Sequence, residues 1–214
     1  VVAKIKNPIK IKKNMIFLDI GCGNGSSTHI WGNKHAIKNY KKISKSIYGV
    51  EPDLDAYNQL KNFCNAYQNI DDIPKNIKFD VIRMNWSLEH VHSPSKYFKF
   101  IGERLRENGH ALICVPNIDG KIYKEDISML ELPIHLFHFN FHSINNYCNK
   151  FNLKIKDCFT FSYASMYYYA SKINVNFKKY GKINLAGLLK MQKNLNKIND
   201  LSGNDIVFLI KNNG

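Results

Sequence analysis

A glycine-rich loop after a short apolar run is the feature that most constrains this chain. Residues 17–27 read Phe-Leu-Asp-Ile-Gly-Cys-Gly-Asn-Gly-Ser-Ser, so apolar positions and a carboxylate precede three glycines that alternate with small residues. This order is typical of a buried strand, a tight turn and the start of a helix. Glycine has no Cβ atom, so a ligand can approach the main chain of such a turn closely. The following helix N-terminus, with its unpaired N–H groups, favours a negatively charged ligand group.

The spacing of the glycines separates two classes of ligand. A dinucleotide loop has the pattern G-x-G-x-x-G, whereas Gly21, Gly23 and Gly25 alternate strictly and Ser26 stands where the last dinucleotide glycine would lie. Asp19, two residues before the first glycine, would repel a pyrophosphate and attract an ammonium group. S-adenosylmethionine meets both conditions, because it joins an adenosine to an ammonium-bearing amino acid and contains no phosphate. An NAD-dependent oxidoreductase is the alternative for this loop.

Several ordered motifs then resemble one family. Residues 17–25 resemble the first motif of the class I S-adenosylmethionine-dependent methyltransferases, and Phe-Asp-Val-Ile from Phe79, Leu-Glu-His-Val from Leu88 and the run over 104–117 resemble its members in ubiquinone biosynthesis and bacterial surface-glycan synthesis. This resemblance implies an α/β fold with a Rossmann-like, seven-stranded, mostly parallel sheet, an antiparallel last strand and helices on both faces. It also implies S-adenosylmethionine as the methyl donor.

The remaining elements are expected where the apolar pattern and its punctuation place them. We predict strands over 46–50, 66–70, 79–85, 111–115, 153–156 and 205–210, and helices over 54–63, from Pro94 to Leu105, and from Ile144 to Phe151. The stretch between Gly25 and Ser46 is longer than one crossover helix needs, and Gly32 favours a break in it.

Cofactor contacts are expected at the carboxyl ends of the strands, where open α/β sheets bind ligands. Glu51 ends the second strand and can accept both ribose hydroxyls, although an acid just before the helix that Pro52 starts can also act as an N-cap, a role that suits Asp53 better. By the resemblance, Asn69 and Ile70 hold the adenine, with Asp71 and Asp72 as alternatives, and residues 85–90 lie near the methionine moiety. The full predicted set is Asp19, Gly21, Cys22, Gly23, Asn24, Gly25, Glu51, Pro52, Asn69, Ile70, Asn85, Trp86 and His90.

Histidine is the natural general base for a hydroxyl acceptor, because its pKa lies near neutrality. His135 is the first candidate, since residues 132–139 resemble the segment that these enzymes place over the acceptor side; His90 is the second, and His138 and His142 are further candidates. A lone histidine in an aromatic-rich loop more often has a structural role. No metal is expected, because the sequence has no cluster with the spacing of H-E-x-x-H.

Composition bounds the class of protein. At 214 residues with 44% hydrophobic content, we expect one domain over 1–214, with a basic lead-in over 1–14 and variable acceptor-side insertions over 118–133 and 161–203. No apolar run approaches the ~18 residues of a membrane span, so a cytoplasmic protein is expected. Five cysteines without C-x-x-C pairing argue against a zinc or disulfide framework. Because the sequence begins with Val, we expect it to be trimmed or part of a longer polypeptide.

The net charge of +14 raises an RNA methyltransferase as an alternative, because a basic surface is typical of nucleic-acid binding. The excess is almost entirely lysine, scattered among Asn and Ile, and only Arg83, Arg104 and Arg106 are arginines. A solvated lysine surface is therefore favoured, and nucleic acid is the less favoured partner. The preferred acceptor is a hydroxyl of a small molecule or saccharide precursor. A non-catalytic scaffold is a third reading, and the sequence leaves the oligomeric state open.

Overall fold

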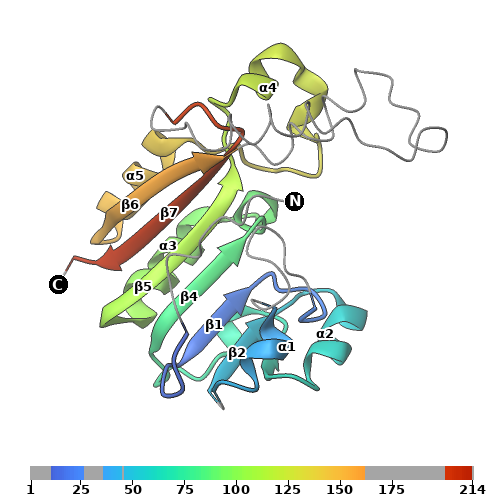
Figure 1. The fold of residues 1–214 in the computed structure, drawn as a ribbon, viewed down its shortest axis with the longest axis vertical. Helices are drawn as coiled ribbons and strands as arrows, with labels where there is room; N and C mark the ends of the chain where they lie inside the picture. The colour runs from blue at the N-terminus through green and yellow to red at the C-terminus, as the bar shows by residue number, and fades with distance from the viewer. Residues whose placement is uncertain (1–10, 27–35, 45, 162–200, 214) are drawn as a thin grey trace, which may run out of the picture.

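The structure is a computed structural model that describes residues 11–26, 36–44, 46–161 and 201–213. Its centre is a seven-stranded sheet in the order β3-β2-β1-β4-β5-β7-β6 (Figure 1). The strands are β1 Phe17–Ile20, β2 Ile47–Val50, β3 Asn65–Tyr67, β4 Phe79–Asn85, β5 Leu105–Pro116, β6 Leu153–Phe161 and β7 Asp205–Asn212. The α-helices are α1 Ile37–Tyr40, α2 Leu54–Leu60, α3 Pro94–Arg104, α4 Lys121–Glu125 and α5 Phe141–Lys150, and the 3-10 helices are η3 Ile70–Asp72, η4 Leu88–His90 and η5 Ile127–Leu130.

The pairing of the strands confirms the predicted sheet. β1 pairs in parallel with β2 and β4, and β5 continues the parallel part, whereas β7 runs antiparallel between β5 and β6. The strand order reverses between β1 and β4. In open α/β sheets a ligand binds outside the carboxyl ends of the strands at such a reversal. The fold therefore directs attention to the loops that leave β1 and β4.

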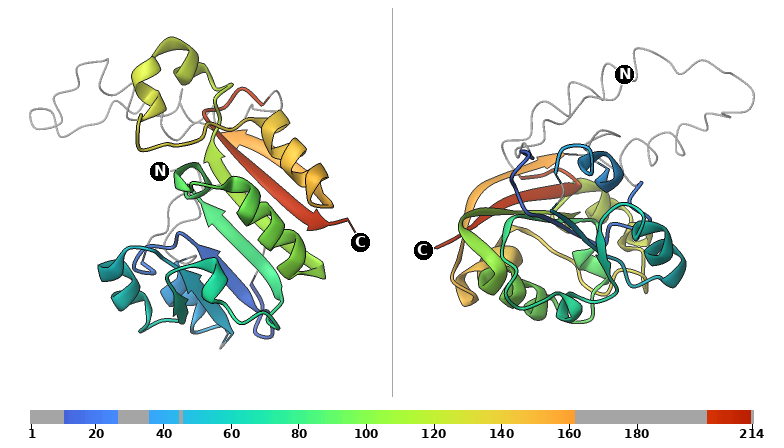
Figure 2. Two further views of the ribbon diagram at one scale, coloured as in Figure 1. Left: turned by 180° about the vertical axis from the view of Figure 1, so that it is seen from behind. Right: turned by 90° about the horizontal axis from the view of Figure 1, so that it is seen from below.

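Side-chain alternation along the strands builds one core on each face of the sheet. Leu18 and Ile20 point into a core with α3 and α5, whereas Phe17 points into a second core with α1 and the end of α2. Seen from behind, α3 and α5 lie across one face of the sheet (Figure 2). The predicted covering of both faces by helices is confirmed.

Several boundaries differ from the predicted ones for local reasons. β3 ends at Tyr67 rather than at residue 70, because the N–H of Asn69 donates to the Asp72 carboxylate and begins η3. α2 begins at Leu54, and Asp53 rather than Pro52 starts it: the Asp53 carboxylate accepts from the N–H of Ala56 at 2.8 Å. The alternative cap assignment to Asp53 is thus confirmed.

The predicted insertions are described only in part. The insertion over 118–133 contains α4 and η5. Most of the insertion over 161–203, most of the lead-in over 1–14, and Gly32 with its predicted break lie outside the described residues. Among the described helices, none has the length and apolar character needed to cross a membrane. The described cysteines are all free thiols, and Cys22 and Cys114 are buried, as expected of small apolar side chains.

Candidate active site

The glycine loop after β1 leaves one side open to a ligand. Gly21, Gly23 and Gly25 all have φ between 55° and 79°, the left-handed region that favours glycine. A Cβ atom at Gly21 would lie 2.4 Å from the Cβ of Ser87, and one at Gly25 would lie 2.5 Å from a methyl carbon of Ile37, whereas one at Gly23 would meet nothing within 4 Å. The outer glycines therefore serve close packing, and the open space lies at Gly23.

The side chains of Cys22 and Asn24, the other two residues between the glycines, both make contacts within the protein. Cys22 is buried, with its Sγ atom directed at the Val50 carbonyl oxygen, so its side chain belongs to the core. Asn24 is half-buried and bonds locally: its amide nitrogen donates to Gln59 at 3.0 Å and its carbonyl oxygen accepts from the N–H of Ser26 at 3.1 Å. Any contribution of Cys22 to a ligand must come from its main chain.

Glu51 connects the tip of β2 to the glycine loop. One carboxylate oxygen accepts from the Gly23 N–H at 2.8 Å, and the other accepts from the Asp53 N–H at 3.0 Å. The side chain is half-buried, while the neighbouring Pro52 is exposed. A carboxylate thus stands at the open position of the loop, where the sequence predicts the ribose.

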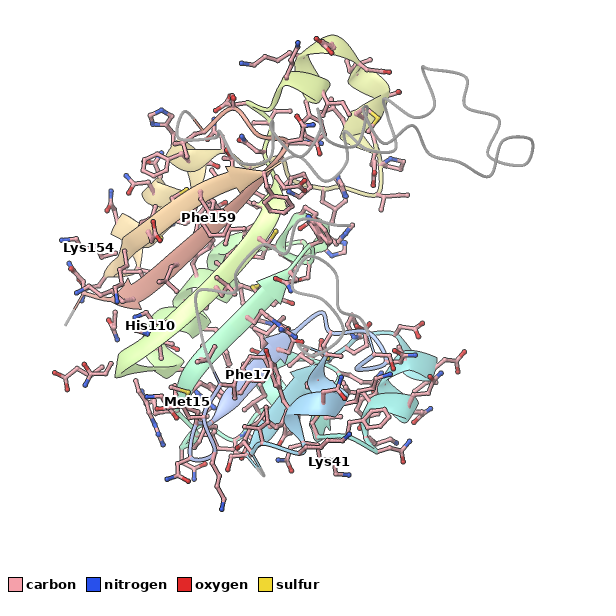
Figure 3. All side chains as sticks on the ribbon, in the orientation of Figure 1. Met15, Phe17, Lys41, His110, Lys154 and Phe159 are labelled. Atoms are coloured by element: carbon pink, nitrogen blue, oxygen red, sulfur yellow. The ribbon has the colours of Figure 1, made fainter. Side chains whose placement is uncertain are left out.

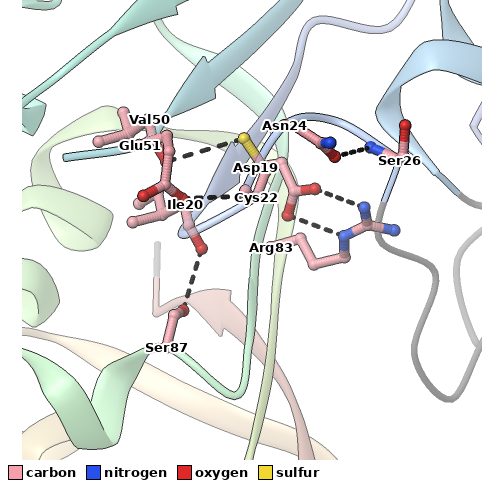
Figure 4. A network of polar contacts seen from close by, with 10 residues as sticks. Asp19, Ile20, Cys22, Asn24, Ser26, Val50, Glu51, Arg83 and Ser87 are labelled. Carbon is pink, nitrogen blue, oxygen red and sulfur yellow. Dashed lines mark hydrogen bonds and ion pairs between the residues drawn. The ribbon is translucent and has the colours of Figure 1, made fainter. Parts of the chain in front are cut away.

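Asp19 is paired with a residue that the sequence analysis did not connect to it. Both of its carboxylate oxygens accept from the guanidinium of Arg83 on the adjacent β4, at 2.9 Å for the Nε bond (Figure 4). Both side chains are buried, and the guanidinium also lies over the rings of Phe17 and Tyr40. The carboxylate predicted to attract an ammonium is therefore already neutralised, and it joins the two central strands.

This pair predicts an asymmetric response to substitution. Asp19→Asn leaves the Arg83 charge buried without its counter-ion and is expected to lower the free energy of unfolding by about 3–5 kcal/mol. Replacing both residues by apolar ones, Asp19→Leu with Arg83→Met, is expected to cost less than the single change, because no charge remains unpaired. Urea unfolding of the three proteins measures this order, and a double variant less stable than Asp19→Asn would contradict it.

The turn after β4 contacts both the glycine loop and β7. Asn85 is buried at the strand end, and Trp86 has a φ of 46° and donates from its indole nitrogen to Asp205 at 2.9 Å. The hydroxyl of Ser87 donates to the carbonyl oxygen of Ile20 at 3.0 Å (Figure 4). Ser87 thus lies against the glycine loop, whereas the Trp86 indole bonds to β7.

The predicted adenine pair separates in the structure. Asn69 is exposed, whereas only 2% of Ile70 is exposed because its side chain packs in the core. The alternative acids are engaged as well: Asp71 forms an ion pair with Lys96, and Asp72 accepts from the Asn69 N–H. Asn69 stays the prediction for adenine, and Ile70 has little surface left for a ligand.

Both predicted catalytic histidines come together beside a carboxylate that the prediction omitted. Glu89, His90 and His135 each offer a ligand-type atom, and these atoms all lie within 4.8 Å of one another. The segment that carries His135 is held against η4, because the N–H groups of Leu136 and Phe137 both donate to the Glu89 carbonyl oxygen. His138 lies beside His135 and contacts the Leu130 carbonyl oxygen instead.

The carboxylate of Glu89 is buried in an electrostatically unfavourable place. Its side chain is 1% exposed, and neither oxygen has a hydrogen-bond partner among the described residues. Burial, opposed by the main-chain N–H of Glu89 itself and assisted by the charges of Asp205 and Glu131, raises the pKa of Glu89 to about 8. Burial also lowers the pKa of His135, so this imidazole favours its neutral form.

The raised pKa of Glu89 predicts that the free energy of unfolding depends on pH in metal-free buffer. Because its pKa is about 8 in the folded state and ordinarily 4.5, the folded state binds more protons between these values, and stability falls as the pH rises from 5 to 8. Glu89→Gln is expected to remove this component and to be more stable than the parent at pH 8 by on the order of a few kcal/mol. Urea unfolding at pH 5 and pH 8 tests this, with exposed Glu107→Gln as the control; identical pH profiles for parent and Glu89→Gln would refute it.

The sequence analysis missed Arg83, and it did not single out Ser87 and Glu89 within the predicted range 85–90, although all three organise this site. Arg83 carries a signal, because an arginine within an apolar strand requires a buried acid, and Asp19 lies in the neighbouring strand. The Leu-Glu-His-Val run contains Glu89, but the sequence does not show that the Glu89 side chain is buried. Its proximity to His135 depends on the path of the chain between them.

The described residues fit the cofactor that the motifs imply. A bare main chain at Gly23, a carboxylate at the tip of β2 and a turn after β4 that touches the loop surround the reversal of strand order. These are features that a nucleoside carrying an amino acid requires: a close approach to the main chain and an acceptor for ribose hydroxyls.

The family match spans most of the chain. A family model described as a methyltransferase domain matches residues 3–157. The chain therefore belongs to the methyltransferase-domain family, within the class I enzymes whose cofactor is S-adenosylmethionine.

Individual relatives show how far the similarity extends. The mitochondrial ubiquinone biosynthesis O-methyltransferase of Candida albicans is 26% identical over 148 residues, which are 66% of this chain and 44% of that protein, so the chain spans less than half of that relative. Among solved structures, an S-adenosylmethionine-dependent methyltransferase of Thermotoga maritima has a TM-score of 0.62 at 13% identity, covering 97% of this chain and 84% of its own. An S-adenosylmethionine-dependent methyltransferase of Clostridium acetobutylicum has a TM-score of 0.58 at 16% identity, and the match covers 94% of this chain and 86% of that one. The structures show the fold.

Proposed function

We propose that this chain transfers the methyl group of S-adenosylmethionine to a hydroxyl oxygen of a small molecule or saccharide precursor. The observation that carries the proposal is the cluster of Glu89, His90 and His135 beside the turn that touches the glycine loop. A neutral hydroxyl is a weak nucleophile and needs a proton acceptor, and the basic nitrogens of the two imidazoles can supply one. The printed name of the Candida albicans relative, an O-methyltransferase, agrees with an oxygen acceptor.

Two neighbouring loops would hold the cofactor. The main chain of Gly21–Gly25 and residues 85–90 face the methionine end, Glu51 accepts the ribose hydroxyls, and Asn69 accepts from the adenine amino group. Since both oxygens of Asp19 already bond to Arg83, Asp19 is assigned a positioning role that fixes the loop on β4. When bound, S-adenosylmethionine supplies a methyl group activated by its sulfonium sulfur.

The acceptor is expected at the carboxyl end of β5, beside the amino end of the antiparallel β7. A pocket of about 300 Å³ lies there, and it combines polar groups with aromatic surface; its lining is Asn117, Asp119, Lys124, Phe141, His142, Leu201, Ser202 and Ile206. That volume is at the lower end of small-molecule sites. His142, the last of the predicted histidines, lines this pocket and lies outside the cluster. A compact polar acceptor fits this pocket better than a nucleic-acid strand.

Cofactor binding tests the first half of the proposal. S-adenosylhomocysteine at a hundred times its Kd is expected to stabilise the protein by ~2.7 kcal/mol, and NAD is expected to have no effect. Glu51→Ala is expected to weaken binding by at least tenfold in calorimetry, because the ribose hydroxyls lose their acceptor. Asp55→Ala, an exposed acid in the first turn of α2, serves as the matched control. Stabilisation by NAD alone would point to an oxidoreductase.

Measurements of methyl transfer test the second part of the proposal, the hydroxyl acceptor. With a labelled methyl donor and a panel of phenols, sugars, amines and tRNA, we expect label in a hydroxyl compound. His135→Ala is expected to lower kcat by ~10²-fold, the contribution of one general base, with KM for the cofactor unchanged. His92→Ala, an exposed histidine two residues beyond the cluster, is expected to retain the parent kcat. Methylation of tRNA alone would replace this proposal by the nucleic-acid alternative, and no turnover on any acceptor would favour a non-catalytic scaffold.

A further inference from the structure

The cluster of Glu89, His90 and His135 brings together polar atoms that make no hydrogen bond to one another. The Nε2 atom of His90 and the nearer Glu89 oxygen are 3.9 Å apart, too far for a hydrogen bond. Neither oxygen of Glu89 nor the Nδ1 atom of His135 has a hydrogen-bond partner in the part of the chain that the structure describes. Buried polar atoms are nearly always satisfied, so three such atoms at one place require an explanation.

The outer nitrogens of both rings fix which atoms carry lone pairs. The Nδ1 atom of His90 lies 3.2 Å from the Ile134 carbonyl oxygen, which can only accept, so Nδ1 carries the hydrogen and Nε2 does not. The Nε2 atom of His135 lies 3.3 Å from a carboxylate oxygen of Glu131, so in the neutral ring the lone pair is on Nδ1. Each imidazole thus donates outward to an oxygen and keeps one basic nitrogen. This is the arrangement that orients metal-binding histidines.

The surroundings favour a cation there. Although the chain carries a net charge of +14, the carboxylates of Glu89, Glu131 and Asp205 lie near one another. They also act together on Tyr123 of α4, whose pKa they raise in addition to the effect of burial. Glu89 and His135 are buried, whereas the His90 side chain is 41% exposed and gives access from solvent. A buried carboxylate without a donor is stabilised when a cation occupies the space beside it.

We propose that Glu89, His90 and His135 form a binding site for one divalent transition-metal ion. The Glu131 carboxylate and the Ile134 carbonyl oxygen orient the two imidazoles from outside. Two nitrogens and one oxygen suit Zn²⁺ or Co²⁺ better than Mg²⁺, which prefers oxygen ligands. Three protein ligands leave a coordination position for an acceptor oxygen. That last step rests on the proposed methyl transfer, whereas binding of the ion does not.

Metal titration tests the site directly. Protein without a polyhistidine tag is dialysed against a chelator and titrated with Co²⁺ by visible absorption and with Zn²⁺ by calorimetry. We expect about one ion per chain, without the near-ultraviolet band of cobalt bound to thiolate, because the cysteines are not ligands. Glu89→Gln and His135→Ala are expected to weaken binding by at least a hundredfold, and Glu131→Ala by about 10–100-fold, the usual effect of an outer partner. His92→Ala is the control, since it is exposed and two residues away from His90.

A second measurement separates loss of the site from loss of the fold. His135→Ala and Glu131→Ala, which lie outside the predicted cofactor contacts, must still bind S-adenosylhomocysteine, and Zn²⁺ must raise the Tm of the parent and of His92→Ala but not of His135→Ala. Absence of stoichiometric binding in the parent, a cobalt–thiolate band, or equal losses in His92→Ala and His135→Ala would each overturn the inference. Since these titrations contain neither cofactor nor acceptor, they can fail while methyl transfer succeeds, and the reverse also holds.

Discussion

The contact between the carboxyl ends of β1 and β4 is the constraint on which the rest of the site depends. Asp19 and Arg83 join the two strands through a buried, two-point ion pair, and Ser87 then bonds to the last residue of β1 and leaves room only for glycine at position 21. Strand order reverses here, so no crossover covers the space above these ends. The glycine loop and the turn that begins the Glu89 cluster are consequently held at a fixed separation. A change in either strand would move both halves of the site together.

Charge is unevenly distributed over this protein. Lysines make the whole molecule basic, yet Glu89 is buried where the charges of Asp205 and Glu131 act on it. The surroundings of the histidines also differ along the sheet. Burial, and then the charges of Lys156 and Lys211, lower the pKa of His110, which lies in the amino-terminal half of β5 and is labelled in Figure 3. His90 and His135 of the cluster instead lie beside the carboxylates of Glu89 and Glu131.

Much of the fold could be predicted from the sequence, because apolar periodicity and glycine spacing are local signals. The loop after β1 follows from residues 17–25, the seven-stranded sheet was implied by the resemblance to the methyltransferases, and Glu51 was placed by its position at a strand end. Tertiary contacts decide the rest. Ile70 stays a prediction for the adenine, but nothing in its own segment shows that a capping bond at Asn69 ends β3 early or that the Ile70 side chain is buried in the core. Asp19 was expected to be available because nothing in its own strand shows that Arg83 lies opposite. Glu89 and His135 are 46 residues apart, so only the folded chain places them in one cluster.

The unsatisfied carboxylate of Glu89 is the clearest conflict between stability and local structure. Its burial disfavours the charged form, and leucine or glutamine at the same position would remove that cost. Trp86 adds a second conflict three residues earlier, since a non-glycine residue with a φ of 46° is strained. Both features lie on the one turn that contacts the glycine loop, the histidine-bearing segment and β7. Locally unfavourable residues that gather where three elements meet are expected at a functional site, because there the surrounding packing can hold them in place and their chemistry requires it.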